Sequence, residues 1–313
     1  MIFLRLVRYK NLFIIALLQV LLRYAMLLPI LTHYGIEPVL SDLRFALVVL
    51  STLLLAASGY VINDYFDIRI DRINRPDSVI VGKRIKRRTA LFLHVLLTVT
   101  GVFIGLFLAY VSRKENYALM YVFIPALLWY YSTTFKRHAV IGNLIISMLT
   151  ALVPYVVVSI EFAMLARVHG ANILQTNACS TAWFWTTGFA FFAFITNLIR
   201  EIIKDTEDLR GDKAVGCRTL PIAIGVNYTK ILVSLLVIAS ILTIWLIFFF
   251  IPEVQSIPYA APYFVLGLSV PYLLLLFQLH RSQSAKNFHV ASSISKVIML
   301  LGIVFILFAG KAF

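Results

Sequence analysis

The stretch NDYFDIRIDRINRPD, residues 63–77, follows directly on the uncharged apolar run ALVVLSTLLLAASGYVI, residues 46–62. It places Asp64, Asp67 and Asp71 at one end of a helix-length hydrophobic segment. Carboxylates about 6 Å apart repel one another by roughly 3 kcal/mol per pair when the effective dielectric constant is near 20. We therefore expect positive charge beside these three side chains, and the rest of the chain indicates which kind.

The composition is that of a polytopic membrane protein. Of the 313 residues, 61% are hydrophobic and 13% are charged, whereas soluble domains contain about 25% charged residues. A membrane-spanning helix needs about 20 predominantly apolar residues. Nine segments meet this requirement, so we predict an all-α protein with nine transmembrane helices in a single domain, residues 1–313. The predicted spans are residues 12–32, 43–62, 89–112, 116–133, 139–162, 181–200, 228–252, 260–279 and 294–312.

The basic residues predict the orientation of these spans. Most of the 28 Lys and Arg residues fall on one side of the predicted membrane, in the N-terminus and the segments 63–88, 134–138, 201–227 and 280–293. Because Lys and Arg accumulate in cytoplasmic loops, we predict a cytoplasmic N-terminus and a C-terminus on the opposite side. The net charge of +14 then lies mainly on the cytoplasmic face. There it suits anionic headgroups and phosphates, and it gives no specific support for nucleic-acid binding.

A second acidic cluster, REIIKDTEDLRGDKAVGCRTLP at residues 200–221, follows the sixth predicted span as the first cluster follows the second span. Asp205, Asp208 and Asp212 repeat the spacing of the first cluster, three residues and then four, at an offset of 141 residues. On a helix this spacing puts three carboxylates on one face. The pattern predicts two four-helix pseudo-repeats followed by a ninth helix, with Asp-rich cytoplasmic loops at 63–88 and 200–221.

Two such carboxylate stripes on one side of the membrane suit a hard divalent cation. Mg²⁺ in particular combines a few carboxylates with the phosphate oxygens of a substrate. A solvated, salt-bridged helix end would explain any single acid here, but two clusters of matched spacing favour a metal site that ionises a phosphorylated substrate. Basic neighbours suit the phosphates. The candidate diphosphate-binding residues are Arg69, Arg75, Lys136, Arg137, Arg200 and Lys204.

The first predicted helix carries Asn11, Gln19 and Arg23 on one face. Arg23 is placed near the middle of the membrane, where a bare charge is costly. No acidic residue is predicted deep within another span to pair with it. Arg23 is therefore expected either to meet an acidic cluster or an anionic ligand in a wet cavity, or to be a buried structural residue of the bundle. If the site transfers a group from the phosphorylated substrate to a second molecule, the acceptor, these three side chains are candidates for binding it.

The two acidic motifs resemble the signatures of the UbiA superfamily of intramembrane prenyltransferases. The family signature N-D-x-x-D-x-x-x-D is matched over residues 63–71, and the signature D-x-x-x-D over residues 208–212. The resemblance spans the whole chain and implies catalytic roles for Asp67, Asp71, Asp208 and Asp212. The Mg²⁺ ligands that it implies are Asn63, Asp64, Asp67, Asp71, Asp205, Asp208 and Asp212.

The reaction that the resemblance implies is Mg²⁺-dependent transfer of an isoprenyl group from a prenyl diphosphate, with release of diphosphate. Within the family, residues 63–77 and 200–221 look most like the branch that makes digeranylgeranylglyceryl phosphate. Geranylgeranyl diphosphate and geranylgeranylglyceryl phosphate are therefore the expected substrates. The alternative acceptor is an aromatic compound of quinone biosynthesis, such as a hydroxybenzoate, homogentisate or a dihydroxynaphthoate. Residues 77–79 read Asp-Ser-Val and depart from that branch, which keeps this alternative open.

Two other classes of membrane protein also use acidic residues. A divalent-cation or anion transporter would hold its ion near the membrane midplane, in broken helices, whereas these acids lie at predicted helix ends. A CDP-alcohol phosphotransferase would resemble the pattern D-G-x-x-A-R, which is absent from the sequence. Both classes are less consistent with the motifs than a prenyltransferase whose active site faces the cytoplasm.

Overall fold

The structure is a computed structural model that describes residues 2–313. Within this part of the chain the elements are helices, and nine of them are long and apolar enough to cross a membrane. The nine predicted spans are thus confirmed, and each observed helix overlaps its predicted segment. The observed spans are Tyr9–His33, Asp42–Phe66, Arg87–Ser112, Glu115–Arg137, Ile141–His169, Asn177–Glu207, Val226–Phe250, Ala260–Arg281 and Ala285–Ala312.

Most spans are single long α-helices, and two are interrupted by a π-helical segment, a wider turn often found at functional sites. The uninterrupted helices are α4 (Asp42–Phe66), α6 (Arg87–Ser112), α7 (Glu115–Thr133), α8 (Ile141–His169), α9 (Asn177–Glu207), α12 (Val226–Phe250) and α16 (Ala285–Val304). The first interrupted span consists of α2 (Tyr9–Leu21), η1 (Leu22–Leu27) and α3 (Leu28–His33). The second consists of α14 (Ala260–Tyr263), η4 (Phe264–Ser269) and α15 (Val270–Arg281).

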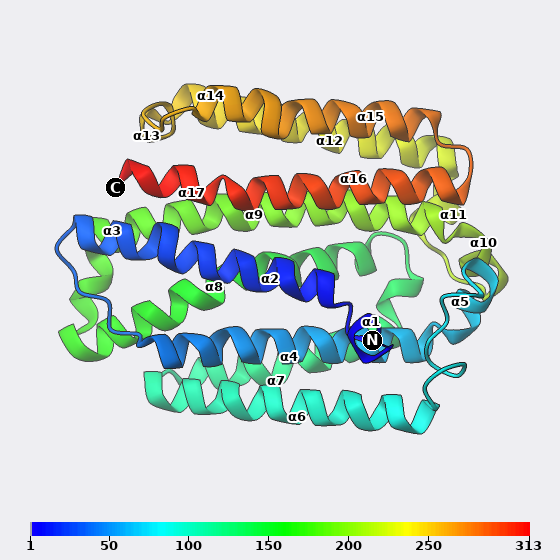
Figure 1. The fold of residues 1–313 in the computed structure, drawn as a ribbon, viewed down its shortest axis with the longest axis horizontal. Helices are drawn as coiled ribbons and strands as arrows, with labels where there is room; N and C mark the ends of the chain where they lie inside the picture. The colour runs from blue at the N-terminus through cyan, green and yellow to red at the C-terminus, as the bar shows by residue number, and fades with distance from the viewer. Residues whose placement is uncertain (1) are drawn as a thin grey trace.

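The spans lie roughly along one axis, with α12 and α15 at one edge of the bundle and α4, α6 and α7 toward the other (Figure 1). Helix α9 packs against α8, α12 and α16 and forms the centre of the largest apolar core. Short helices at the bundle ends connect the spans. They are α1 (Ile2–Leu6), α5 (Ile68–Asn74), η2 (Phe135–Arg137), η3 (Ala171–Gln175), α10 (Leu209–Ala214), α11 (Leu220–Ile224), α13 (Pro252–Gln255), α17 (Ile306–Ala309) and η5 (Gly310–Ala312).

Helices α4 and α9 end in the same way, each at the middle aspartate of its acidic motif. Asp67 has φ −84° and ψ 2°, and Asp208 has φ −90° and ψ 4°. Both values lie in the sparsely populated bridge region, where active-site residues are often found. After the break α5 continues from α4, and α10 continues from α9. The matching breaks give the two acidic motifs equivalent positions in the two halves of the bundle.

These breaks correct the prediction that each set of three aspartates shares the face of one continuous helix. The spacing of the aspartates indicates a helical period within each motif, but it does not show whether the helix is straight. In the structure the regular helix is interrupted at Asp67 and at Asp208, and the axis changes direction there. As a result α5 and α10 turn toward each other and lie side by side at one end of the bundle, while the C-terminus lies at the opposite end (Figure 1). The bend therefore brings together two motifs that are distant in the sequence.

A buried ion pair fixes the other end of the bundle and corrects the interpretation of Arg23. Its Nη1 lies 2.8 Å from Oε2 of Glu161, and the side chains are 3% and 0% exposed. The Oε1 atom of Glu161 accepts hydrogen bonds from the backbone N–H groups of Val39 (2.7 Å) and Leu40 (3.1 Å). The sequence placed Glu161 at the outer limit of a span ending at residue 162. Because α8 continues to His169, Glu161 instead lies within the helix and supplies the acidic partner that Arg23 was expected to lack.

Replacing Glu161 with Ala should therefore strongly destabilise the protein, because it removes the buried counter-charge of the Arg23 guanidinium and leaves only the exposed Asp42, 3.7 Å away. Loss of one partner of a buried pair costs about 3–5 kcal/mol. The double variant Arg23→Met, Glu161→Met should unfold closer to the wild type, because both charges are removed. Thermal unfolding in detergent would measure all three proteins, with the exposed Glu253→Ala as a control. A single variant as stable as the control would contradict the assignment.

Candidate functional site

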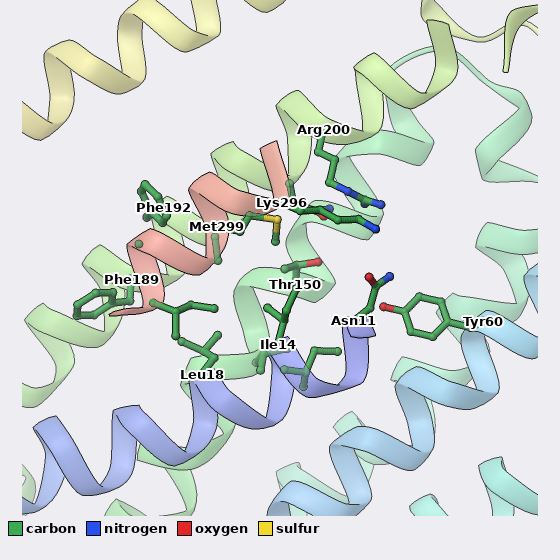
Figure 2. Close-up of a pocket in the computed structure, with 16 residues that line it drawn as sticks. Asn11, Ile14, Leu18, Tyr60, Thr150, Phe189, Phe192, Arg200, Lys296 and Met299 are labelled. Atoms are coloured by element: carbon green, nitrogen blue, oxygen red, sulfur yellow. The ribbon is translucent and has the colours of Figure 1, made fainter. Parts of the chain in front are cut away.

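Two apolar cavities meet inside the bundle. The first, which we call the α4–α8 cavity, lies among α4, α7 and α8 and has an empty volume of about 1170 Å³, part of it open to solvent. The second, the α9–α16 cavity, lies among α2, α9 and α16 and has an empty volume of about 740 Å³, part of it open to solvent (Figure 2). Five polar residues line both cavities, and we call them the polar junction. They are Asn11, Tyr60, Thr150, Asn197 and Arg200.

The α4–α8 cavity extends from an apolar interior to the first acidic motif. Asn63 of that motif lines it, together with Glu201 and Lys204 from the last turns of α9. Its other walls are largely hydrophobic and include Leu55, Ala56, Leu128, Ile146, Leu149 and Val156. A ligand with a charged head and a hydrocarbon tail would therefore find matching surroundings along this cavity.

The first acidic motif is held by cations from two other parts of the chain. The Nζ atom of Lys136, in η2 between α7 and α8, lies 2.5 Å from Oδ1 of Asp67 and 3.2 Å from Oδ1 of Asn63. The other carboxylate oxygen of Asp67 accepts a hydrogen bond of 2.7 Å from Nδ2 of Asn63. Asp64 accepts from Nη2 of Arg8 at 2.7 Å. Asp64 and Asp67 thus have the positive neighbours that the sequence analysis expected, whereas no ion pair within residues 2–313 reaches Asp71.

The second motif receives its cation from the loop that follows the first. The Nη2 atom of Arg75 lies 2.6 Å from Oδ1 of Asp208 and 2.8 Å from Oε1 of Glu207. Asp205 accepts a hydrogen bond of 2.9 Å from Nδ2 of Asn143 in α8. Arg75 therefore links the two halves of the site electrostatically, because it belongs to one half and neutralises carboxylates of the other.

Asn74 joins α5 to α10 by hydrogen bonds in both directions. Its Nδ2 donates to the backbone carbonyl of Asp208 at 3.0 Å, and its Oδ1 accepts from the backbone N–H of Gly211 at 2.8 Å. We call this pair of bonds the Asn74 clasp. The clasp requires close approach at Gly211, since a Cβ atom built there would lie 2.5 Å from Nδ2 of Asn74. It holds the two acidic motifs together despite their like charge.

The carboxylates at this end of the bundle carry more negative charge than the nearby cations neutralise. Burial and the neighbouring carboxylate of Asp67 raise the pKa of Asp71 to about 6. Burial, together with Asp208 and Asp67, raises the pKa of Asp212 to about 7. Burial also raises the pKa of Asp208, although Arg75 opposes the shift. These shifts indicate a site in which a further positive charge would be favourable.

The donor set fits Mg²⁺ supplied together with a phosphorylated ligand. Among residues 2–313 no three acidic, His or Cys side chains already converge into a metal cage. Mg²⁺ does not require such a cage, because it is typically bound through one or two carboxylates with water and substrate phosphate oxygens completing the octahedron. Carboxylates facing each other from α5 and α10, with surplus negative charge, provide the oxygen ligands that this mode of binding needs.

The structure brings most of the predicted site residues to this region. Lys136 and Arg75 contact the acidic motifs, and Arg200 and Lys204 both contact Glu201, at 2.5 and 3.2 Å. Arg69 and Arg137, in contrast, are exposed and make no side-chain hydrogen bond within the described chain. The predicted role of Arg69 and Arg137 in diphosphate binding therefore has no support from a contact in the structure.

The three predicted acceptor-binding residues have separate positions. Asn11 lines the polar junction. The Nε2 atom of Gln19 donates to Oγ1 of Thr52 at 3.1 Å and thus links α2 to α4. Arg23 forms the ion pair with Glu161 described above and lines neither cavity. The structure therefore supports an acceptor contact for Asn11 but not for the other two side chains.

Sequence reasoning missed several polar residues of the site. Asn74 and Asn143 hold the acidic motifs in place, and Asn197 and Lys296 line the α9–α16 cavity. Asn143, Asn197 and Lys296 share one detectable signal, because each lies within a predicted membrane span, where a polar side chain is costly and often functional. Asn74 has no such signal, since it belongs to a polar loop and its role depends on tertiary contact.

Comparison with known proteins identifies the same family as the signatures of the two acidic motifs. The model of the UbiA prenyltransferase family matches residues 14–308. The chain is 32% identical over 264 residues to digeranylgeranylglyceryl phosphate synthase of Korarchaeum cryptofilum, covering 84% of each protein. These matches extend over both acidic motifs and over nearly all of the nine spans.

Solved structures share the fold at lower sequence identity. The apo structure of a UbiA homologue from Aeropyrum pernix matches with a TM-score of 0.65 and 13% identity, over 95% of this chain and 97% of that one. A UbiA homologue from Archaeoglobus fulgidus bound to GPP and Mg²⁺ matches with a TM-score of 0.55 and 17% identity, over 98% of this chain and 99% of that one. The likeness extends over nearly the full length of each chain.

Replacing Gly211 with Ala should separate α5 from α10, because the added methyl group would displace the Asn74 amide and break the clasp. We expect a loss of about 1–3 kcal/mol in stability and a larger relative loss of activity, since the acidic motifs would move apart. Gly188→Ala is the matched control, because it lies in α9 with open space around the new Cβ. Diphosphate release and thermal unfolding would measure both variants. Equal behaviour of the two would contradict the role of the clasp.

The raised pKa values predict how the metal-free protein responds to pH. The pKa values of Asp71 and Asp212 are higher in the folded protein than in the unfolded chain, so the folded state binds more protons. Their contribution to the free energy of unfolding therefore falls as pH rises from about 4 through 7. The unfolding temperature of EDTA-treated protein should therefore decrease over this range, and Mg²⁺ should raise it more at about pH 8 than at about pH 5.5. Asp212→Asn should reduce both effects. An unchanged pH profile in this variant would refute the explanation.

Proposed function

The chain belongs to the UbiA prenyltransferase family, and on this basis we propose that it transfers a geranylgeranyl group from geranylgeranyl diphosphate to the hydroxyl group of geranylgeranylglyceryl phosphate. The observation that carries the proposal is the meeting of two acidic motifs beside two joined apolar cavities. The similarity to a digeranylgeranylglyceryl phosphate synthase over most of both chains supports this acceptor over an aromatic one.

The diphosphate head would lie between α5 and α10. Mg²⁺, when bound there with the substrate, would neutralise charge on the leaving diphosphate. We expect Asp67 and Asp208, at the two helix breaks, to hold it, with Asp71 and Asp212 one turn further along. Further oxygen ligands would come from the remaining polar side chains of the two motifs, Asn63, Asp64 and Asp205.

Basic side chains near the motifs would stabilise the leaving group. Lys136 contacts Asp67 and Arg75 contacts Asp208, so each can turn toward a diphosphate oxygen when metal neutralises its carboxylate. Lys204 lines the α4–α8 cavity at its charged end. These cations are held beside the site before the substrate arrives, so a turn of each side chain is enough to bring positive charge to the leaving diphosphate.

The hydrocarbon tail of the prenyl donor would occupy the α4–α8 cavity, whose interior walls are largely apolar. Breakage of the C1–O bond leaves its electron pair on diphosphate and an allylic cation on the chain. The acceptor hydroxyl then forms the new C–O bond and loses its proton, so that the products are the diether, diphosphate and one proton. Tyr60 and Tyr131 line this cavity, and their aromatic rings could stabilise the cation.

The distribution of basic residues supports a cytoplasmic position for this site. Lys136, Arg75 and the N-terminal Arg8 belong to the segments rich in Lys and Arg, and all three contact the acidic motifs. Such segments face the cytoplasm in membrane proteins. Water-soluble Mg²⁺ and diphosphate would thus exchange with the cytoplasm, while both hydrocarbon substrates and the product stay within the bilayer.

Diphosphate release from geranylgeranyl diphosphate would test the proposal. Purified wild-type protein with Mg²⁺ should release diphosphate when geranylgeranylglyceryl phosphate is added, and mass spectrometry should detect the diether product. Stimulation by 4-hydroxybenzoate or a dihydroxynaphthoate in its place would overturn the acceptor but leave prenyl transfer intact. Metal and diphosphate binding without release under any of these conditions would favour a carrier over an enzyme.

In the same assay Asp67→Ala and Asp208→Ala should each reduce turnover by at least about 100-fold, because each removes a carboxylate from one of the two helix breaks. Asp77→Ala is the control, since Asp77 is an exposed acid just beyond the first motif. Thermal unfolding should show that all three variants fold. Retention of activity in either motif variant would refute the metal-binding assignment.

A further inference from the structure

Lys296 is a cation within a membrane span that the diphosphate site does not use. It lies in α16 and lines the α9–α16 cavity, where its side chain points toward the same space as that of Arg200 from α9 (Figure 2). It makes no hydrogen bond or ion pair with any residue from 2 to 313. A Lys that faces a cavity in a membrane bundle is costly unless it binds an anion, so its position needs an explanation.

Arg200 beside it has unused hydrogen-bonding capacity. The residue is 8% exposed, and its Nη1 contacts Glu201 at 2.5 Å. Its Nε–H, however, has no acceptor within the described structure. An unpaired buried donor costs free energy, and a ligand oxygen in the cavity would supply the missing acceptor. Arg200 belongs to the polar junction and therefore reaches both cavities.

The local charge count leaves room for a dianion. Glu201 is the contact of both Arg200 and Lys204, at 2.5 and 3.2 Å. Lys204 therefore offsets the charge of Glu201, and the α9–α16 cavity itself is lined by two cations, Arg200 and Lys296, with no carboxylate among its described lining residues. A phosphate monoester carries about −1.5 to −2 charges near neutral pH. One phosphorylated headgroup would therefore balance the two cations that line the α9–α16 cavity.

The two cavities differ in how they would hold a phosphate. The α4–α8 cavity adjoins the acidic motifs, and its lining combines the oxygen ligands of Asn63 and Glu201 with the cations Arg8, Arg200 and Lys204. This combination suits a diphosphate bound through a metal. The α9–α16 cavity has no carboxylate among its described lining residues, and its charged groups are Arg200 and Lys296. It suits a phosphate bound directly by cations. The rest of its wall is apolar and includes Phe189, Phe192 and Met299.

We propose that the α9–α16 cavity binds the acceptor, with Lys296 and the Nε–H of Arg200 holding its phosphate monoester and the apolar wall holding its hydrocarbon chain. The inference rests on the proposed function and assigns each lipid substrate to one cavity. The polar junction lies where the cavities meet, so an acceptor hydroxyl placed there would face C1 of the donor. Lys296 and Arg200 then act as binding residues that select a phosphorylated acceptor.

The test compares Lys296→Met with wild type, using geranylgeranylglyceryl phosphate and its dephosphorylated analogue geranylgeranylglycerol. We expect the variant to raise the KM for the phosphorylated acceptor roughly 10- to 100-fold, and to change the KM for geranylgeranyl diphosphate by less than about twofold. With the dephosphorylated acceptor, wild type and variant should perform equally poorly. Lys296→Arg should restore much of the lost affinity, because it keeps the charge.

Lys286→Met is the matched control, since Lys286 is exposed on the same helix and should leave both KM values unchanged. Lys296→Met should fold at least as stably as wild type, because it removes an unpaired charge. An equal rise in both KM values, or an equal loss with the dephosphorylated acceptor, would overturn the phosphate assignment. Failure of wild type to use the phosphorylated acceptor at all would instead overturn the proposed function.

Discussion

The structure of the site depends on holding like charges together. Two acidic motifs at the ends of α4 and α9 face each other with more carboxylates than cations, and burial increases their repulsion. The Asn74 clasp, Arg75 and Lys136 oppose this repulsion from different elements. None of them neutralises the site fully. The remaining negative charge makes the site receptive to a divalent cation, so the same imbalance that weakens the metal-free fold prepares it for its ligand.

The interior of the bundle offers separate binding places for the two substrates of one reaction. Negative groups at the α5–α10 end are suited to a diphosphate with metal, whereas Arg200 and Lys296 are suited to a phosphate without metal. We expect this difference in charge to favour each headgroup in its own position. Apolar walls then direct both hydrocarbon chains into the bundle. The polar junction is the place where the two requirements meet, and it combines uncharged Asn, Thr and Tyr side chains with the cation Arg200.

Much of this arrangement could be predicted from the sequence. Hydropathy located nine spans, and the matched spacing of Asp64, Asp67 and Asp71 with the second motif indicated paired sites, because both signals are local. The axis breaks at Asp67 and Asp208 could not be predicted, since carboxylate spacing is the same on a straight or a bent helix. The partner of Arg23 was missed because α8 extends beyond its predicted end and buries Glu161. Roles such as that of Asn74 depend on contacts between distant segments.

The distance of 141 residues between Asp67 and Asp208 also has a consequence in time. Chains are made at about 5–20 residues per second, so the first motif is complete roughly 7 to 28 s before the second emerges. During that interval Arg8 and then Lys136 are the partners already synthesised for its carboxylates. The contacts that hold the first motif in the mature protein are thus also those that are available to the nascent chain, before α9 and α10 exist.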